Sequence, residues 1–286
     1  MKKTLIISDC PDWAISTLMI PLKKTGADIA YHYVNTSKGT GIGEKHPIHL
    51  TIDLLRQYDQ IHFTTIRAVD SILQNKEALQ LLEGKRVLMT IYTEEDKNLS
   101  LIKGDHWKRI DQFISPTKYQ QEKVKEYTSK EAIYIPFAID EKKYSFTTDY
   151  PRRTDIIGYV GRIMPHKHLK DIVEASSGLQ VAAIGYVDNE GHDYWHSIPK
   201  DNLTHYQNLT EDQKIEIMRN FTIYVSISGP HIETGPLGVL ECAALGIPII
   251  TTDVGWAKDN LHKHQAIFIN QRNMELPEMI EWAMNC

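Results

Sequence analysis

The sequence predicts an α/β protein of two Rossmann-like domains, each built around a doubly wound parallel sheet. Short runs of β-branched residues alternate with segments of helical period from end to end, which is the pattern of strand, helix, strand units. A length of 286 residues suits two domains of ordinary size. The strand pattern stops between Pro136 and Arg153, in a polar stretch punctuated by proline, and then resumes. We therefore expect domains over residues 1–150 and 151–286, with a ligand cleft between them.

The first domain is expected to contain a parallel sheet with helices between its strands. Trp13 to Lys24 has one apolar face and ends in two lysines, which predicts a helix packed on the sheet. The expected strands are Thr4–Ser8, Asp28–Val34, Gln60–Thr64, Arg86–Tyr92, Gln112–Ser115 and Ala132–Ile135.

The second domain repeats the pattern. Its expected strands are Asp155–Val160, Gln180–Ile184, Leu203–Tyr206, Thr222–Ser226, Pro248–Thr251 and Ala266–Ile269. Its expected helices begin at His168 or span Glu211–Asn220, Leu237–Leu245 and Asn273–Met284. The last helix is a candidate for packing back toward the first domain.

The charge composition argues against a general nucleic-acid-binding or membrane-surface protein. The net charge of −5, from 32 basic and 37 acidic side chains, gives no overall attraction to nucleic acid or anionic membranes. Four lysines on one short stretch favour some anionic surface locally: Lys118, Lys123, Lys125 and Lys130.

The cysteines and the first residues bear on location. Cys10, Cys242 and Cys286 lack metal-ligand spacing and do not suggest a disulfide framework, which favours a reducing cytosol. The apolar run near the start is short and soon meets Asp9, so it predicts a strand and not a signal peptide. No stretch reaches the roughly 18 apolar residues of a membrane span. A cytoplasmic protein is expected.

The most informative motif runs from Glu233 to Glu241. Gly-Pro-Leu-Gly, residues 235–238, lies between the two acids and leads into an apolar run of helical period. If a helix starts near Leu237, its positive dipole end and free N–H groups can hold phosphate while an acid binds hydroxyls. A sugar nucleotide offers both groups.

A second motif follows the first strand of the second domain. Gly161 frees the backbone where the chain leaves the strand, and Arg162 and Lys167 project cations from the loop. A guanidinium and an ammonium together can neutralise a diphosphate. His166 and His168 flank Lys167, and we interpret both as loop residues, not as metal ligands.

These two motifs, Gly-Arg-x4-Lys and Glu-x7-Glu, resemble those of the retaining GT-B glycosyltransferases, specifically the large group called family 4 or glycosyl transferases group 1. The segments 113–119 and 134–140 are similar to the end of that family's first domain. Thr251 to Trp256 resembles the family's Thr-Asp-x-Gly-Gly turn, with Trp256 in place of the second glycine. The resemblance covers most of the chain and implies the GT-B fold, two Rossmann-like domains facing a central cleft.

The resemblance implies roles for individual residues. Arg162 and Lys167 would bind the donor diphosphate and stabilise the departing nucleotide, and Glu233 would contact hydroxyls of the donor sugar. Glu241 would hold the ribose hydroxyls. The remaining donor-binding positions would be Gly161, Gly185, Tyr206, Gly235, Pro236, Leu237 and Gly238. Family members generally need no metal, so no cofactor is expected, and the nucleotide sugar is a substrate.

Departures from the family concern the first domain, which normally binds the acceptor. The segment from Ser8 to Trp13 lacks the family's Gly-Gly pair, and Asp9 lies in it. Tyr92 stands where a histidine is expected, and His62 is another candidate for the cleft. Glu94 follows a strand end, where it either faces the cleft or begins a helix.

The resemblance implies a retaining, metal-independent transferase that moves a sugar from a UDP- or GDP-linked donor to a hydroxyl acceptor. The acceptor could be a glycan, a lipid-linked sugar, a small molecule, a protein or a modified DNA base. Two alternatives keep the fold: a protein that binds sugar nucleotides without transfer, and a GT-B sugar-nucleotide epimerase.

Overall fold

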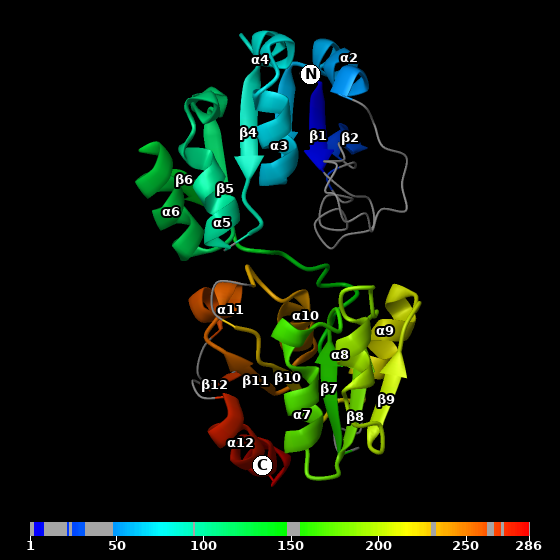
Figure 1. Cartoon of the computed structure of the whole chain (residues 1–286). Helices are drawn as coiled ribbons and strands as arrows, with labels where there is room; N and C mark the ends of the chain where they lie inside the picture. Colours follow the sequence, from blue (N-terminus) through cyan, green and yellow to red (C-terminus); the bar gives the residue numbers. More distant parts are fainter. Residues whose placement is uncertain are drawn as a thin grey trace. The chain divides into compact units, whose positions relative to one another are not determined.

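The computed structural model describes residues 3–8, 22, 25–31, 48–93, 95–147, 155–229, 233–261, 266–269 and 272–285. The chain divides into two compact units, Met1–Pro136 and Phe137–Cys286 (Figure 1). The division falls before the polar stretch, whereas the sequence-based boundary lay within it, at residue 150. The segment from Phe137 to Tyr144 belongs to the second unit because its aromatic and aliphatic side chains pack in that unit's core.

The described part of the first unit contains one parallel sheet of six strands, in the order β2-β1-β3-β4-β5-β6. The strands are β1 (Thr4–Ser8), β2 (Ala27–Tyr31), β3 (Gln60–Phe63), β4 (Arg86–Thr90), β5 (Gln112–Ser115) and β6 (Ala132–Tyr134). The helices are α2 (Ile48–Gln57), α3 (Ile66–Leu73), α4 (Lys76–Leu81), α5 (Asp96–Leu99), η2 (Ser100–Lys103), η3 (Asp105–Arg109) and α6 (Lys118–Thr128).

Helices cover the first sheet with apolar side chains, as the β-branched strand runs predict. One cluster of almost fully buried side chains fills the space between sheet and helices: Phe63 and Phe113 from the strands, Leu55 and Val69 from the helices, and Trp107. This core holds the carboxyl ends of β3 and β4, which carry two of the candidate acceptor-side residues.

The second unit has a second parallel sheet of six described strands, in the order β12-β11-β10-β7-β8-β9 (Figure 1). They are β7 (Ile156–Val160), β8 (Gln180–Ile184), β9 (Leu203–Tyr206), β10 (Ile223–Ser226), β11 (Ile249–Thr252) and β12 (Ala266–Ile269). The helices are η4 (Pro165–Lys167), α7 (Leu169–Ala175), α8 (His192–His196), α9 (Glu211–Met218), α10 (Leu237–Leu245), α11 (Gly255–Asn260) and α12 (Arg272–Asn285).

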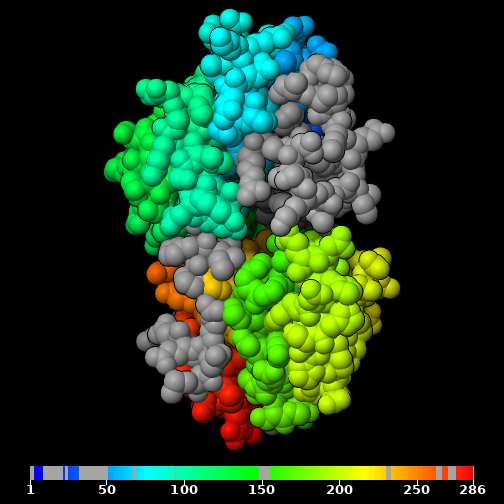
Figure 2. Space-filling view, viewed as in Figure 1, coloured from blue at the N-terminus to red at the C-terminus, as the bar shows by residue number. Residues whose placement is uncertain are grey.

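Both faces of the second sheet are buried. Ile157, Val181 and Val225 pack with α7 and α12 on one face, whereas Tyr224 and Ile249 pack with α9 and α10 on the other. Figure 2 shows the first of these faces covered by the α7 and α8 segments, green to yellow-green. This strand order reverses between β7 and β10, so the topological switch point of the sheet lies beyond their carboxyl ends.

The predicted α/β class with two parallel sheets is confirmed, and the predicted strands that the structure describes differ from the observed ones by a few terminal residues at most. The predicted helix at Trp13–Lys24 lies largely outside the described residues. The last helix, α12, packs on α7 and β12 within the second unit. Within the described ranges, no helix is long and apolar enough to cross a membrane.

Candidate active site

Two glycines bring the loops after β7 and β8 into contact. The N–H of Gly161 donates to the carbonyl of Ile184 at 2.9 Å, and the N–H of Gly185 donates to the carbonyl of Tyr206 at 2.9 Å. A Cβ at Gly185 would overlap the carbonyl oxygen of Gly161, and Gly161 itself has φ +155°. Only glycine fits at residue 185, and the loop that carries Arg162 is thereby fixed to the sheet.

Arg162 lies beside an acid that the sequence analysis missed. Its Nη1 is 3.4 Å from Oδ2 of Asp188, and its carbonyl accepts a 2.6 Å hydrogen bond from the hydroxyl of Tyr159. Oδ1 of Asp188 accepts from the N–H of Gly191 at 2.9 Å, so the carboxylate is anchored in its own loop. The Arg162 side chain is 40% exposed and its guanidinium has five N–H donors, which leaves most of them available to a ligand.

Lys167 and Glu233 form an ion pair at the switch point. Their side chains are only 15% and 13% exposed, and Nε2 of His166 lies 3.9 Å from the same carboxylate oxygen. Burial, followed by the charge of Lys167, lowers the pKa of His166, so the imidazole stays neutral and leaves the pairing to Lys167. A buried ion pair of this kind is held by the loops after β7 and β10, which are neighbours in the sheet.

Glu233 leads into the start of α10. Gly235 packs so closely on Phe137 and Trp256 that a Cβ would lie 2.9 Å from the Cβ of Trp256. Pro236 caps the helix, and the N–H groups of its first turn, at Leu237 and Gly238, have no intrahelical acceptor. The positive end of the helix dipole therefore lies directly after Glu233.

Trp256 does not replace a glycine in an open turn. Its N–H donates to the carbonyl of Thr234 at 2.7 Å, and the residue belongs to helix α11, where the sequence analysis expected a turn. Its side chain is buried, and its indole N–H has no hydrogen-bond partner among the described residues.

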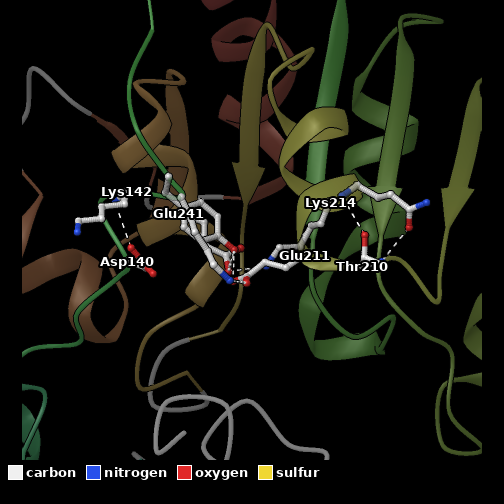
Figure 3. A network of polar contacts seen from close by, with 9 residues as sticks. Asp140, Lys142, Thr210, Glu211, Lys214 and Glu241 are labelled. Atoms are coloured by element: carbon white, nitrogen blue, oxygen red, sulfur yellow. Dashed lines mark hydrogen bonds and ion pairs between the residues drawn. The ribbon is translucent and has the colours of Figure 1, made fainter. Parts of the chain in front are cut away.

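Glu241 lies inside α10 and is buried (Figure 3). Its Oε1 accepts from Nζ of Lys214 at 2.6 Å and from the hydroxyl of Tyr144 at 3.0 Å. Its Oε2 is buried and has no partner among the described residues. An unmatched buried carboxylate oxygen is costly, which marks this atom as an acceptor for a ligand.

The sequence analysis also missed Lys214 and Tyr144. A signal for Lys214 was available: it lies four residues before Met218 on α9, on the helix face that carries buried Ile215 and Met218. A cation at the edge of an apolar face suggests a buried acid nearby. Tyr144 gives no such signal, since it follows a polar stretch and lies 97 residues from Glu241 in sequence.

The candidate acceptor-side residues are described only in part. Asp9 and Glu94 lie outside the described residues. His62 on β3 makes a 2.7 Å hydrogen bond between Nε2 and Oγ1 of Thr90, and burial lowers the pKa of its imidazole to about 4. Burial raises the pKa of Tyr92 well above its usual range. Both side chains are therefore uncharged at neutral pH.

The basic stretch on α6 is largely neutralised within the first unit. Lys123 pairs with Glu126 at 3.0 Å and Lys125 with Glu131 at 2.7 Å. Lys130 donates to the carbonyl of Lys108 at 2.9 Å. The structure thus weakens the argument for an anionic partner at this stretch.

Solved structures with a similar fold include a protein bound to UDP-glucose and two synthases. HepE of Anabaena in complex with UDP-glucose is 11% identical, with a TM-score of 0.76 over 99% of this chain and 90% of that one. Sucrose-phosphate synthase of Thermosynechococcus elongatus is 14% identical, with a TM-score of 0.75 over 100% and 91%. The catalytic domain of starch synthase IV of Arabidopsis thaliana, bound to ADP and acarbose, is 12% identical, with a TM-score of 0.67 over 99% and 92%.

A comparison with curated protein sequences finds no match. The family model described as glycosyl transferases group 1 matches residues 140–286, more than half of the chain. This match includes both motifs and the whole second sheet. The chain therefore belongs to glycosyl transferases group 1 and is a glycosyltransferase of the GT-B fold.

Proposed function

We propose that the enzyme transfers a sugar from a nucleoside diphosphate sugar, UDP- or GDP-linked, to a hydroxyl acceptor. The observation that carries the donor assignment is the buried pair of Lys167 and Glu233 at the switch point of the second sheet. Such a donor joins its diphosphate directly to C1 of the sugar. A cation and a carboxylate side by side match that junction, one for phosphate and one for sugar hydroxyls.

The remaining donor contacts follow from the same frame. Arg162 would bind the diphosphate with Lys167, and the N–H groups at the start of α10 would add to the positive field. Oε2 of Glu241 would accept from the ribose hydroxyls, which matches its lack of a partner among the described residues. The loops at Gly185 and Tyr206 would flank the base.

The chemistry requires charge stabilisation at the leaving group. As the bond from C1 to the β-phosphate oxygen breaks, its electron pair moves onto that oxygen, where Arg162 and Lys167 stabilise it. The acceptor oxygen forms the new bond at C1, on the face that the phosphate leaves. The acceptor's proton passes to the departing phosphate. Because the new bond forms on the face that the phosphate leaves, the product retains its anomeric configuration.

We propose that no metal takes part, because two cations and a helix start supply positive charge where a metal would. Within the described ranges, no group of three or more His, Cys, Asp or Glu side chains is arranged as a metal site. A direct check is donor turnover in the presence of EDTA, which should equal turnover with added Mg²⁺.

The acceptor is proposed to bind on the side of the first unit, near His62 and Tyr92, with Asp9 and Glu94 as further candidates. His62 is neutral and bonded to Thr90, so it can orient a hydroxyl but holds no charge for an anionic group. A glycan, lipid-linked sugar, small molecule, protein or modified DNA base would each supply the required hydroxyl. A location in the reducing cytosol is part of this proposal, and the low number of cysteines supports it.

The test measures release of the nucleotide from UDP-glucose and GDP-mannose, with water as the default acceptor and then with an acceptor screen. We expect Glu233→Ala and Arg162→Ala each to slow turnover by about 10² to 10³, the effect of removing one transition-state contact. Lys170→Met serves as the control, because among the described residues Lys170 forms an ion pair with Glu174 alone, at 3.8 Å on α7. If neither variant slows turnover, the assignment is wrong.

The two alternatives give different results in the same assay. A protein that only binds sugar nucleotides would bind the donor in calorimetry and release no product with any acceptor. An epimerase would form an epimer of the donor sugar without an acceptor, whereas a transferase that uses water would release the sugar unepimerised.

A further inference from the structure

Glu241 is held from one side only. Of its two carboxylate oxygens, Oε1 has two donors, Nζ of Lys214 and the hydroxyl of Tyr144, whereas Oε2 has no partner among the described residues. The side chains of Lys214 and Glu241 are 23% and 11% exposed.

The donors on Oε1 are themselves fixed. Lys214 lies on α9, whose first turn is stabilised by a capping box (Figure 3). In this box the side chain of Thr210 accepts from the N–H of Gln213, and the side chain of Gln213 accepts from the N–H of Thr210. Nζ of Lys214 also lies 5.4 Å from the centre of the Tyr144 ring, within cation–π range. The ammonium of Lys214 therefore contacts both Glu241 and Tyr144, whose hydroxyl donates to Glu241.

Tyr144 is held in the same way from the other side. Its hydroxyl also lies 3.4 Å from Oε1 of Glu211, which pairs with Lys143. Burial, together with the charges of Glu241 and Glu211, raises the pKa of Tyr144 well above its usual range, so the phenol remains protonated and must donate. Each acid of the network has its own lysine, Lys143 for Glu211 and Lys214 for Glu241, and the neutral phenol of Tyr144 lies between the two acids.

We propose that Lys214 and Tyr144 are positioning residues that hold Oε1 of Glu241 and so present Oε2 alone to the ribose of the donor nucleotide. The inference rests on the donor site proposed above and adds two residues to it. Because Oε1 is already occupied, ligand binding requires no rotation of the carboxylate, and its ordering cost is met during folding. Loss of either donor frees the carboxylate to turn, and the ribose contact weakens.

A merely structural role predicts a different pattern. If Lys214 only neutralised a buried acid, its loss would loosen the whole unit and lower affinity for every nucleotide to the same extent. If it positions Oε2, its loss lowers affinity only for nucleotides that carry ribose hydroxyls.

The experiment titrates the full chain with UDP, GDP and ADP, and with the 2′,3′-dideoxy counterpart of each, by calorimetry. Lys214→Met should weaken binding of the ribonucleotide by about 10-fold, the typical effect of one hydrogen bond to a charged group, and leave the dideoxy nucleotide unchanged. Lys214→Arg keeps a cation at this position and should retain most of the wild-type affinity for the ribonucleotide. Lys170→Met is the matched control and should change neither.

Two further variants keep the test decisive. Tyr144→Phe removes one hydroxyl without removing charge, so it remains informative if Lys214→Met lowers the folded fraction. Glu241→Gln combined with Lys214→Met should lose no more ribonucleotide affinity than Glu241→Gln alone, because both changes act through one contact.

Equal loss for ribose and dideoxy nucleotides, or no loss in either lysine or tyrosine variant, would overturn the inference while the donor site stands. Failure of the wild-type chain to bind all three diphosphates would instead overturn the donor site, and the inference with it.

Discussion

Lys167→Met tests whether the buried pair with Glu233 exists. Methionine keeps the aliphatic stem and removes the ammonium. Among the described residues, the carboxylate of Glu233, 13% exposed, then keeps the neutral His166 at 3.9 Å as its one remaining basic partner. Breaking a buried pair by removing one partner costs 3–5 kcal/mol, and the residual exposure of both groups places the expected loss at about 3 kcal/mol. The control, Lys170→Met, breaks an exposed helical pair and should cost less than about 0.5 kcal/mol.

The second half of the test is the double variant Lys167→Met/Glu233→Gln. Removing the acid as well eliminates the orphaned charge, so the double variant should recover about 2 kcal/mol relative to Lys167→Met. Because the chain has two units, a single unfolding free energy is poorly defined, and hydrogen exchange of peptides that cover β7 and β10 reports on this unit alone. Additive losses in the two single variants would show that the two side chains do not interact.

Three other predictions concern packing and protonation. Gly185→Ala should destabilise the second unit by more than about 2 kcal/mol, because its Cβ overlaps the carbonyl of Gly161. Gly84→Ala is the comparison: with φ +76° and open space around its Cβ, it should cost about 1 kcal/mol, and thermal melting measures both. Burial lowers the pKa of His62 from 6.5 to about 4, so the folded state loses stability as pH falls below 6.5, by about 2 kcal/mol at pH 5. His62→Gln should abolish that slope in urea titrations of the first unit, and an unchanged slope would assign it to other groups. Burial, followed by the charge of Glu241, raises the pKa of the Cys242 thiol, so iodoacetamide should alkylate it only after denaturation, as peptide mass spectrometry can show.

The strands could be predicted because sheets covered on both faces require continuous β-branched runs. Gln112–Ser115 and Gln180–Ile184 were predicted with the bounds that the structure shows. Helix α8 could not be predicted, since His192–His196 has no apolar period. Helix α11 begins at Gly255, a residue that in the sequence alone indicates a turn. In the structure, the N–H of Trp256 in this helix donates to the carbonyl of Thr234, next to Glu233.

The motif residues of the donor site could be predicted from spacing, but their partners could not. Asp188 lies 26 residues from Arg162, and Lys214 lies 27 residues from Glu241. Tyr144 lies 97 residues from Glu241. Such contacts depend on the order of strands in the sheet, which places β8 and β10 on either side of β7. Sequence spacing specifies which residues leave each strand end, and the strand order decides which of them meet.

The second sheet also explains how two buried acids can serve an anionic substrate. Glu233 and Glu241 would repel a diphosphate if they stood alone, yet each has its own lysine, Lys167 and Lys214, bound at Oε1. The two pairs leave the local charge near zero, so Arg162 and the start of α10 supply the net attraction. Loss of Lys167 would therefore weaken diphosphate binding twice, by removing a cation proposed to bind the diphosphate and by leaving Glu233 without its lysine. In the proposed donor site, sugar and ribose recognition by carboxylates is compatible with phosphate binding because each acid is already paired with a lysine before the donor binds.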